Sequence, residues 1–195
     1  MLASLLKDFN IILASGSPRR QQFFTELNID FSIQLRPVDE VYPDEIKGKE
    51  IAHYLSKLKA AAFDNLDKND ILITGDTIVL HKNRCLGKPE NSQEAFDMIK
   101  SLSGSVHEVV SAVCFTSAEK QVTVSDTTGV WFKELTDEEI NYYVKNYKPF
   151  DKAGAYGIQE WIGAIGVTKI EGSYNTVMGL PTHLVYKTLM EFVKR

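Results

Sequence analysis

The stretch A-S-G-S-P-R-R, residues 14–20, follows the short apolar run I-I-L of residues 11–13. This order predicts a buried strand, a turn that contains glycine, and a helix that begins with serine and proline. A strand–turn–helix corner of this kind is typical of α/β folds. Taken alone, the stretch leaves two alternatives open, because it could form an ordinary corner or a binding site for a highly charged anion.

The anion alternative follows from the residue types at this corner. The start of a helix presents unpaired backbone N–H groups and partial positive charge, and both suit a phosphate. Gly16 would let the backbone approach the ligand closely, and Ser17 precedes Pro18 as the expected N-cap. Arg19 and Arg20 lie in the first turn, where cations oppose the helix dipole unless an anion is bound.

Outward from the corner, short runs rich in Ile, Val and Phe alternate with segments of helical periodicity. Strands are predicted at residues 10–14, 31–35, 71–74, 78–81, 108–116, 121–133 and 164–170. Helices are predicted at residues 18–27, 48–66, 92–102, 137–146 and 181–194. The alternation in the first half, followed by long strands, predicts an α/β fold with a mixed sheet and a single domain over residues 1–195.

The composition excludes several classes of protein. A net charge of −4 argues against general binding of nucleic-acid polymers, so positive charge would have to be gathered locally. No apolar run approaches the roughly 18–20 residues of a membrane span, and the N-terminus lacks the basic leader of a signal peptide. We therefore expect a cytoplasmic protein without a membrane partner. Cys85 and Cys114 lack metal-ligand spacing and are expected to be reduced and structural.

Two acidic residues are candidates for metal binding. Asp76 lies in I-T-G-D-T-I-V, residues 73–79, between apolar residues at a predicted strand break. It could hold a metal or activate a water, or it could be a turn residue that bonds its own backbone. Glu40 lies in a polar loop that contains proline, and paired in space with Asp76 it would complete a divalent-metal site.

Two further motifs could face a ligand. G-K-P, residues 87–89, is a tight turn that presents Lys88, although a turn lysine is usually only solvated. D-K-A-G-A-Y-G-I-Q, residues 151–159, suits neither a regular helix nor a strand and predicts an irregular wall near a ligand. The amide of Gln159 could read the edge of a base, since it both donates and accepts hydrogen bonds. The sequence contains neither a P-loop nor a G-x-S-x-G motif.

Together these motifs resemble the Maf family of nucleoside triphosphate pyrophosphatases. The matching pieces occur in the family's order and run through nearly the whole chain. They are S-G-S-P-R-R (15–20), G-D-T (75–77), G-K-P (87–89), L-S-G (102–104), D-K-A-G-A-Y-G-I-Q (151–159) and G-S-Y-N-T-V-M-G-L-P (172–181). The resemblance implies a fold like that of inosine triphosphate pyrophosphatases, with an elongated mixed central sheet flanked by helices in two lobes.

The resemblance also implies an activity and a set of site residues. Hydrolysis of a nucleoside triphosphate to the monophosphate and pyrophosphate is expected, with Mg²⁺ or Mn²⁺ as cofactor. Asp76 would accept a proton from the attacking water, and Glu40 would join it in holding the metal. Lys59 and Lys88 would also be catalytic and would face the phosphates. The remaining implied roles are phosphate binding by Ser15, Gly16, Ser17, Arg19 and Arg20, and base selection by Arg19, Thr77 and Gln159.

In the family, an Asp-Thr pair and the A-G-A-Y-G-I-Q wall mark the branch that acts on dTTP and UTP, so Thr77 and Gln159 predict pyrimidine substrates. Thr74-Gly75, before Asp76, and Glu160-Trp161, after Gln159, depart from the family pattern. The resemblance would also allow a homodimer, for which no residue pattern of this chain argues.

Three alternatives compete with this function. They are a house-cleaning pyrophosphatase for modified nucleotides, a non-catalytic nucleotide-binding regulator of cell division, and a general phosphatase that releases orthophosphate directly. A pure binding protein would have no reason to keep every ionisable group that catalysis needs. A panel of nucleotides assayed with and without inorganic pyrophosphatase separates the enzymatic alternatives.

Overall fold

The strand–turn–helix corner predicted at the N-terminus is present in the computed structural model, which describes residues 1–194. Strand β1 (Asn10–Leu13) is followed by a turn and by helix α2 (Pro18–Glu26), with Ser17 at the N-cap and Pro18 in the first turn. The fixed φ of proline suits the first turn of a helix, which explains why α2 begins here.

The other elements follow the predicted alternation. The remaining helices are α1 (Leu2–Leu5), α3 (Glu50–Ala61), α4 (Ser92–Leu102), α5 (Asp137–Tyr147), η1 (Ala153–Ala155), α6 (Trp161–Gly166), α7 (Tyr174–Val177) and α8 (Thr182–Phe192). The remaining strands are β2 (Ser32–Ile33), β3 (Asp70–His81), β4 (Arg84–Leu86), β5 (Val106–Thr116), β6 (Gln121–Phe132) and β7 (Val167–Glu171).

Within residues 1–194, seven strands form one mixed sheet. Six of them follow the order β2-β1-β3-β5-β6-β7, and β4 pairs with β3. β1 runs parallel to both β2 and β3, whereas the β3–β4 and β6–β7 pairs are antiparallel. Parallel strands require a crossover connection, and α2 and α3 provide it in the first part of the chain. The predicted α/β class with a mixed sheet is therefore confirmed.

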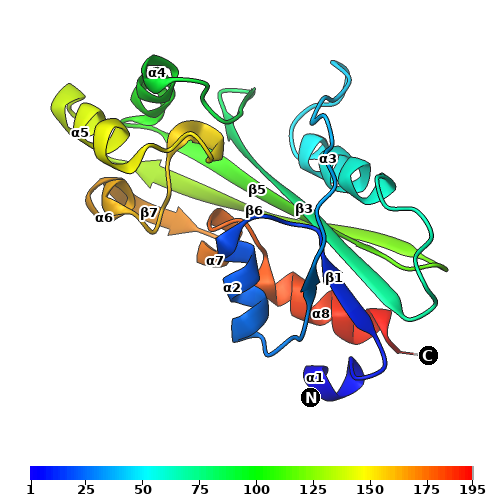
Figure 1. Cartoon of the computed structure of the whole chain (residues 1–195). Helices are drawn as coiled ribbons and strands as arrows, with labels where there is room; N and C mark the ends of the chain where they lie inside the picture. Colours follow the sequence, from blue (N-terminus) through cyan, green and yellow to red (C-terminus); the bar gives the residue numbers. More distant parts are fainter. Residues whose placement is uncertain (195) are drawn as a thin grey trace. The chain divides into compact units, whose positions relative to one another are not determined.

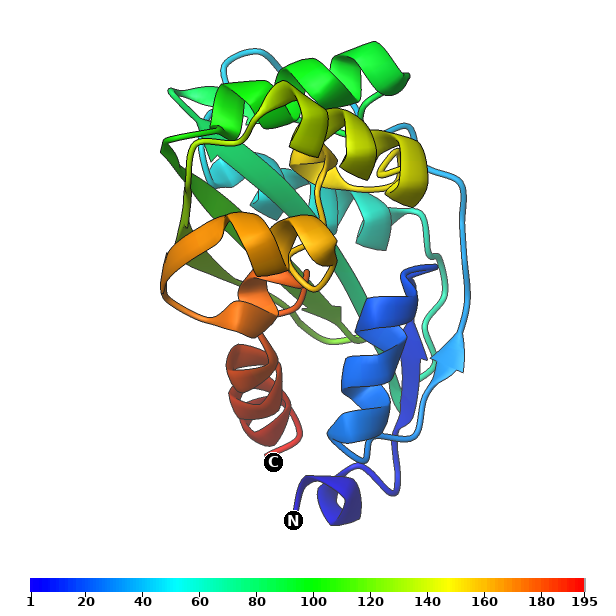
Figure 2. The ribbon, with the colours of Figure 1, turned by 90° about the vertical axis from the view of Figure 1, so that its left-hand side faces the viewer.

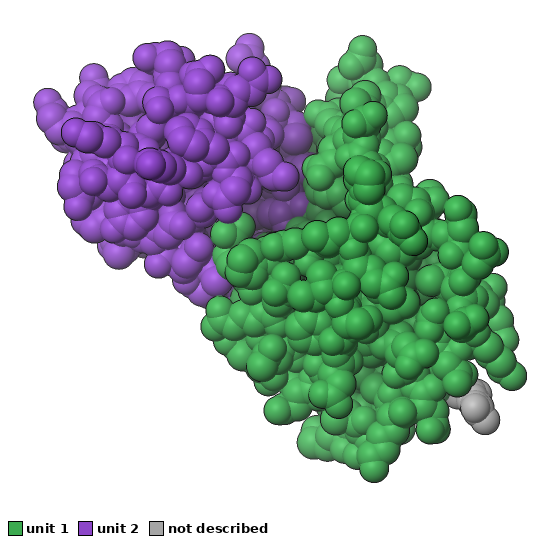
Figure 3. Space-filling view, viewed as in Figure 1, with its two compact units in different colours: residues 1–76, 111–126, 179–195 green, residues 77–110, 127–178 purple. Residues whose placement is uncertain are grey.

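The chain divides into two compact units, which Figure 3 colours separately. Unit 1 comprises Met1–Asp76, Ser111–Asp126 and the described residues from Gly179 onward. Unit 2 comprises Thr77–Val110 and Thr127–Met178. Each unit is assembled from separated stretches of chain, so neither is a contiguous half of the sequence. The single domain predicted over residues 1–195 stays a prediction.

Each unit has its own apolar core. In unit 1, β1, β3, β5 and α3 bury Ile12, Leu72, Cys114 and Ala60 against one another. The chain ends also meet in unit 1, where α1 contacts α8 (Figure 2). In unit 2, α4 packs against α5 (Figure 1), and the core contains Ile99, Ile140 and the fully buried ring of Tyr143. Burial of such apolar surface is the main term that stabilises either unit.

Three sequence-based boundaries were wrong. The predicted break at Gly75–Thr77 does not occur, because β3 runs without interruption from Asp70 to His81. The strand predicted at residues 164–170 is instead the end of α6 followed by β7. A short apolar run does not by itself distinguish a buried helix from a strand. The helix predicted over residues 48–66 is shorter, since α3 spans Glu50–Ala61.

Helix caps account for several of the correct boundaries. Thr136 forms a capping box with Glu139 at the start of α5. Asn91 accepts a hydrogen bond from the backbone of Glu94 at the start of α4. Cys85 and Cys114 form no disulfide in the described chain, as expected. None of the helices within residues 1–194 combines the length and the apolar character needed to cross a membrane.

Candidate active site

The corner before α2 in unit 1 is built by main-chain pairing. The amide of Ala14 donates to the carbonyl of Ile73 at 2.9 Å, which extends the parallel contact between β1 and β3 by one residue. The backbone then turns, and the amide of Ser17 donates to the buried Ser15 hydroxyl at 3.3 Å. The Ser17 hydroxyl caps no amide of α2 within the described chain, so that part of the N-cap prediction was wrong.

Arg20 joins three segments of unit 1. Its Nε donates to the carbonyl of Gly179 at 2.9 Å, and its Nη1 donates to the carbonyl of Gly75 at 2.8 Å. Nη1 also lies 3.4 Å from the Ser15 hydroxyl oxygen. Burial lowers the pKa of Arg20, and the nearby Asp76 carboxylate works in the opposite direction. Two of the three guanidinium nitrogens therefore bind main-chain carbonyls, which makes Arg20 part of the framework beside Asp76.

Gly75 is the point where this framework is tightest. A Cβ at this position would lie 3.0 Å from the carbonyl oxygen of Ala112 and 3.6 Å from the Arg20 guanidinium carbon. The contact with Ala112 would be tight, whereas the one with Arg20 would be an ordinary van der Waals contact. Glycine before Asp76 thus lets the neighbouring strand approach closely in unit 1.

The centre of the candidate site is a cluster of three charged side chains. The Lys59 ammonium lies 2.6 Å from Asp76 Oδ1 and 3.0 Å from Glu40 Oε1. The side chain of Asp76 is 9% exposed and that of Lys59 is 19% exposed, whereas that of Glu40 is 42% exposed. Three residues that are distant in the sequence thus meet in unit 1, with Asp76 at the buried end and Glu40 toward solvent.

A second hydrogen bond sets the position of α3 over β3. The hydroxyl of Thr74 donates to the carbonyl of Ser56 at 2.7 Å. Alternate residues of a strand share a face, so Thr74 and Asp76 both point toward α3. Lys59 lies about one turn after Ser56, which brings its ammonium to the Asp76 carboxylate. Thr74, which departs from the family pattern, thus has a defined structural role.

The environment of Asp76 alters its acidity. Burial raises the pKa of Asp76, while the charges of Lys59 and Arg20 and the hydrogen bond from Lys59 lower it, and burial dominates. A carboxylate whose pKa is raised toward neutrality is a better proton acceptor than an exposed aspartate. Buried carboxylates that face specific charged partners are frequent at catalytic centres.

The same residues fit a divalent cation. In the structure the Lys59 ammonium is held by both carboxylates, so Asp76 and Glu40 already converge on one positive charge. Mg²⁺ usually takes one or two protein carboxylates and completes its shell with water and substrate phosphates. The described residues contain no group of three or more His, Cys, Asp or Glu side chains placed to hold a metal. Two protein carboxylates are therefore the number of ligands expected for a metal ion that binds together with a phosphate substrate.

The other predicted residues belong to both units. Gly16 is exposed, and Arg19 is partly exposed in the first turn of α2 in unit 1. Thr77 directly follows Asp76 and is the first residue of unit 2. Lys88 is exposed in the loop between β4 and α4 of unit 2. Gln159 is exposed at the end of the irregular segment that precedes α6 in unit 2.

Sequence reasoning missed a second charged cluster, which lies in unit 2. The Lys152 ammonium lies 3.2 Å from Glu160 Oε1 and 2.7 Å from Asp151 Oδ1. The hydroxyl of Tyr143 donates to Glu160 Oε2. Lys152 belongs to the motif D-K-A-G-A-Y-G-I-Q, and Glu160 departs from the family pattern, but neither feature predicts that the two side chains pair. The helical spacing of α5 marks Tyr143 as a core residue, so no local pattern connected the three.

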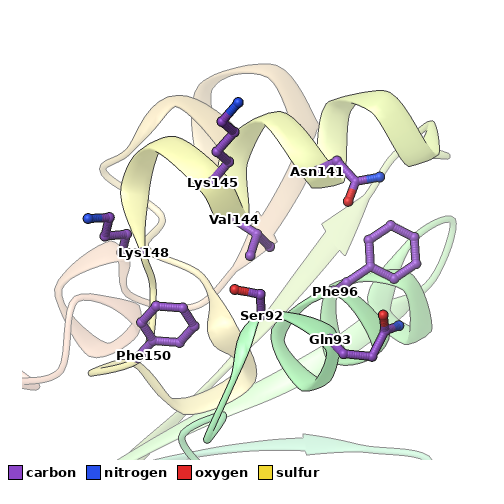
Figure 4. Close-up of a pocket in the computed structure, with 8 residues that line it drawn as sticks. All are labelled: Ser92, Gln93, Phe96, Asn141, Val144, Lys145, Lys148 and Phe150. Carbon is purple, nitrogen blue, oxygen red and sulfur yellow. The ribbon is translucent and has the colours of Figure 1, made fainter.

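Unit 2 also contains a surface cavity of about 330 Å³ between α4 and α5 (Figure 4). It is lined by Ser92, Gln93, Phe96, Asn141, Val144, Lys145, Lys148 and Phe150. This lining shares no residue with the predicted site. The candidate site is therefore defined by its charged side chains and not by this cavity.

Comparison with solved structures supports the fold. A structure titled as the Staphylococcus aureus Ham1 protein aligns with a TM-score of 0.50 and 14% identity, covering 94% of this chain and 99% of that chain. At this level of identity the likeness concerns the fold alone. It agrees with the mixed α/β class predicted from the sequence.

Comparison with curated sequences is much closer. A Flavobacterium johnsoniae protein named dTTP/UTP pyrophosphatase is 57% identical, with 99% of this chain and 100% of that protein covered. A Christiangramia forsetii protein of the same name is 58% identical, with 99% of each chain covered. The sequence model of the family described as Maf-like protein matches residues 10–192. With the family's motifs in place and nearly the whole chain matched, this protein belongs to the Maf family.

Proposed function

We propose that this chain hydrolyses dTTP and UTP to the nucleoside monophosphate and pyrophosphate. Two relatives named dTTP/UTP pyrophosphatase match it over nearly their full length at 57–58% identity. The main structural support for this reaction is the cluster in unit 1, where Lys59 forms ion pairs with Asp76 and Glu40. A buried carboxylate held against a lysine is suited to proton transfer beside a polyphosphate.

Asp76 is the proton acceptor in this proposal. Hydrolysis at the α-phosphorus requires a water that loses a proton as it attacks, while pyrophosphate departs from the opposite side. Because burial raises the pKa of Asp76, its carboxylate takes that proton more readily than an exposed aspartate would. Before a metal binds, Lys59 keeps the carboxylate ionised and oriented through its contact of 2.6 Å.

The corner before α2 supplies positive charge for the triphosphate. The N-terminus of α2 presents backbone N–H groups, and Arg19 lies in its first turn. Arg20 holds Gly75 and Gly179 through their carbonyls, so we assign it the role of fixing the backbone next to Asp76. Such preorganised charge stabilises the transition state without reorganisation during the reaction.

Asp76 and Glu40 would hold Mg²⁺ or Mn²⁺ in this proposal. When bound, the metal would neutralise phosphate charge and lower the pKa of a coordinated water. The carboxylates already converge on one cation, the Lys59 ammonium, which supports their use as metal ligands. Displacing that ammonium would leave Lys59 able to donate to a phosphate oxygen.

The residues of unit 2 complete the proposed set by family resemblance. Lys88 is assigned to the phosphates, and Thr77 and Gln159 are assigned to the base. Within unit 2 the loop that carries Lys88 is tied to the irregular wall, because the amide of Gly154 donates to the carbonyl of Gly87 at 3.0 Å. Lys88 is exposed, so its side chain is accessible to an anionic ligand.

The test is a panel of dTTP, UTP, CTP, GTP and ATP with Mg²⁺, assayed for orthophosphate with and without added inorganic pyrophosphatase. We expect a signal only with the coupling enzyme, and the highest kcat/KM for dTTP and UTP. Orthophosphate released without the coupling enzyme would indicate a phosphatase. Turnover confined to modified nucleotides would indicate a house-cleaning enzyme, and binding without turnover would indicate a regulator.

A further inference from the structure

The irregular segment of residues 152–160 in unit 2 is held tightly except at one side chain. All residues from Lys152 to Ile158 are buried or partly buried, whereas Gln159 is exposed. Gly154 and Ala155 both adopt positive φ, at 69° and 60°. A left-handed alanine is strained and persists only where its surroundings impose it. The segment is therefore a rigid support that presents Gln159 to solvent.

Helix α6 packs against the segment of residues 152–160 and restricts its backbone. A Cβ on Gly163 would lie 1.9 Å from the carbonyl oxygen of Ile158, so the helix backbone packs directly on the residue before Gln159. The amide of Gly163 donates to the carbonyl of Glu160 at 2.9 Å, and the amide of Glu160 donates to the carbonyl of Gly157 at 3.0 Å. These contacts restrict the backbone on both sides of Gln159.

Glu160 is held at both of its carboxylate oxygens. Oε2 accepts from the Tyr143 hydroxyl, and Oε1 lies 3.2 Å from the Lys152 ammonium. The Tyr143 oxygen in turn accepts from the amide of Gly157 at 3.0 Å. Burial and the neighbouring Glu160 raise the pKa of Tyr143, so the phenol keeps its proton and remains a donor. The side chains of Lys152 and Glu160 are only 9% and 20% exposed, so water screens this contact poorly.

The side chains of Gln159 and Glu160 both approach Gly157. A Cβ built on Gly157 would lie 2.9 Å from Glu160 Oε2 and 3.1 Å from Gln159 Nε2. Both polar groups therefore occupy the space that a side chain at residue 157 would take. A carboxylate only accepts hydrogen bonds, so it favours an amide whose nitrogen, and not its oxygen, is turned toward it.

We propose that Glu160, held by Tyr143 and Lys152, is a positioning residue that fixes the amide of Gln159 and thereby selects uracil and thymine over cytosine. This inference rests on the proposed function, in which Gln159 contacts the base. An amide that is free to rotate could pair with either base, because it presents a donor or an acceptor as needed. Uracil and thymine carry an N–H donor at position 3, where cytosine of nearly the same shape has only a lone pair. An amide whose nitrogen is turned toward Glu160 presents its oxygen, which accepts from that N–H. A fixed amide distinguishes them, and a rotating amide does not.

The sharpest variant is Gly157→Ala. The added methyl group would meet Glu160 and Gln159 side-chain atoms at 2.8–3.1 Å, with no backbone atom among those contacts. The two side chains must move while the fold is kept. Since one directed hydrogen bond contributes about a factor of ten, we expect the ratio of kcat/KM for UTP over CTP to fall about tenfold. Glu160→Gln and Tyr143→Phe should lower the same ratio in the same direction.

A matched control comes from α5 in the same unit. Glu139 pairs with Lys133 at 2.7 Å and completes the capping box with Thr136. Glu139→Gln should therefore lower the melting temperature, as a purely structural change would, and leave the UTP/CTP ratio at the wild-type value. Melting temperatures of all variants show whether loss of stability accompanies any loss of selectivity.

A double-variant cycle identifies the route of the effect. Gln159→Ala should lower the UTP/CTP ratio, and adding Gly157→Ala to it should cause no further change, because the methyl group acts through Gln159. The inference is overturned if Gly157→Ala and Glu160→Gln keep the wild-type ratio while Gln159→Ala loses it. It is also overturned if Gln159→Ala itself keeps the ratio. A failure of the proposed function is distinguished from these outcomes, because the wild-type protein would then hydrolyse neither dTTP nor UTP.

Discussion

Replacing Lys59 by methionine tests the central cluster of unit 1 most directly. Methionine keeps the length and the apolar stem of the side chain, so no large cavity is created. It removes the ammonium that lies 2.6 Å from Asp76 and 3.0 Å from Glu40. The variant therefore isolates the charge that holds the two carboxylates together.

The size of the effect follows from the burial of the partners. Breaking a buried ion pair costs about 3–5 kcal/mol, because the remaining charge stays buried without compensation. Asp76 is 9% exposed and belongs to this class, whereas Glu40 is 42% exposed and its contact contributes at most about 1 kcal/mol. Protonation of Asp76 relieves part of the cost. We expect a loss of about 3 kcal/mol in the free energy of unfolding at pH 8.

The loss should depend on pH with a defined sign. Burial raises the pKa of Asp76 above its unfolded value of 3.8, and Lys59 opposes that rise. Without Lys59 the pKa of the folded state is higher still, so the folded variant binds a proton more tightly than the unfolded chain does. Its stability therefore falls as the pH rises from 3.8 through the raised pKa. The deficit relative to wild type should be smaller at pH 5 than at pH 8.

The measurement is urea unfolding followed by far-UV circular dichroism at pH 5 and pH 8. Lys57→Met is the matched control, because Lys57 lies on the same helix and is exposed. It should change the free energy of unfolding by less than about 0.5 kcal/mol. A Lys59→Met deficit below about 1 kcal/mol at pH 8, or one equal at both pH values, would refute the view that Lys59 keeps a buried carboxylate ionised.

Three further predictions concern buried polar groups. Asp76→Asn should lower kcat for UTP by a factor of about 10²–10⁴ in a coupled pyrophosphatase assay, because the proposed proton acceptor is removed. Burial lowers the pKa of His107 to about 3, so this group should cost about 1.4 kcal/mol of stability per pH unit from pH 6.5 down to about pH 3, and His107→Gln should reduce the slope in urea titrations by that amount. Thr74→Val should cost about 1–2 kcal/mol in urea unfolding, since the carbonyl of Ser56 loses its partner.

Each of these predictions has an outcome that contradicts it. Near-normal turnover of UTP by Asp76→Asn would remove that residue from the proposed mechanism. An unchanged acid slope in His107→Gln would mean that another group causes the loss of stability. A Thr74→Val variant as stable as wild type would show that α3 is held over β3 without that hydrogen bond.

The β3 segment shows how far local patterns reach. The apolar runs on either side of Gly75-Asp76-Thr77 predict two strands, and these three residues predict a break between them. Local sequence favours that reading, because glycine and aspartate are poor strand residues. The strand continues through these residues, and Arg20 and Lys59, from α2 and α3, bind the Gly75 carbonyl and the Asp76 carboxylate within it.

Residues 160–171 show a second kind of failure. An apolar run of this length is compatible with either a buried helix or a strand. The helix α6 is selected by Gly163, whose lack of a side chain lets the backbone pack on Ile158. This close approach of two backbone segments is possible because glycine has no Cβ. The spacing of apolar residues along the sequence does not predict it.

The amino-acid sequence alone determined the α/β class, most helix starts and the identity of the charged residues that the family motifs contain. These features depend on interactions over a few residues, such as capping, proline geometry and the alternation of apolar side chains. The partners of those charges were decided by the tertiary structure: Lys59 between Glu40 and Asp76 in unit 1, and Glu160 between Lys152 and Tyr143 in unit 2. Ion pairing depends on distance in space, and folding brings together residues whose separation along the chain says nothing of their contact.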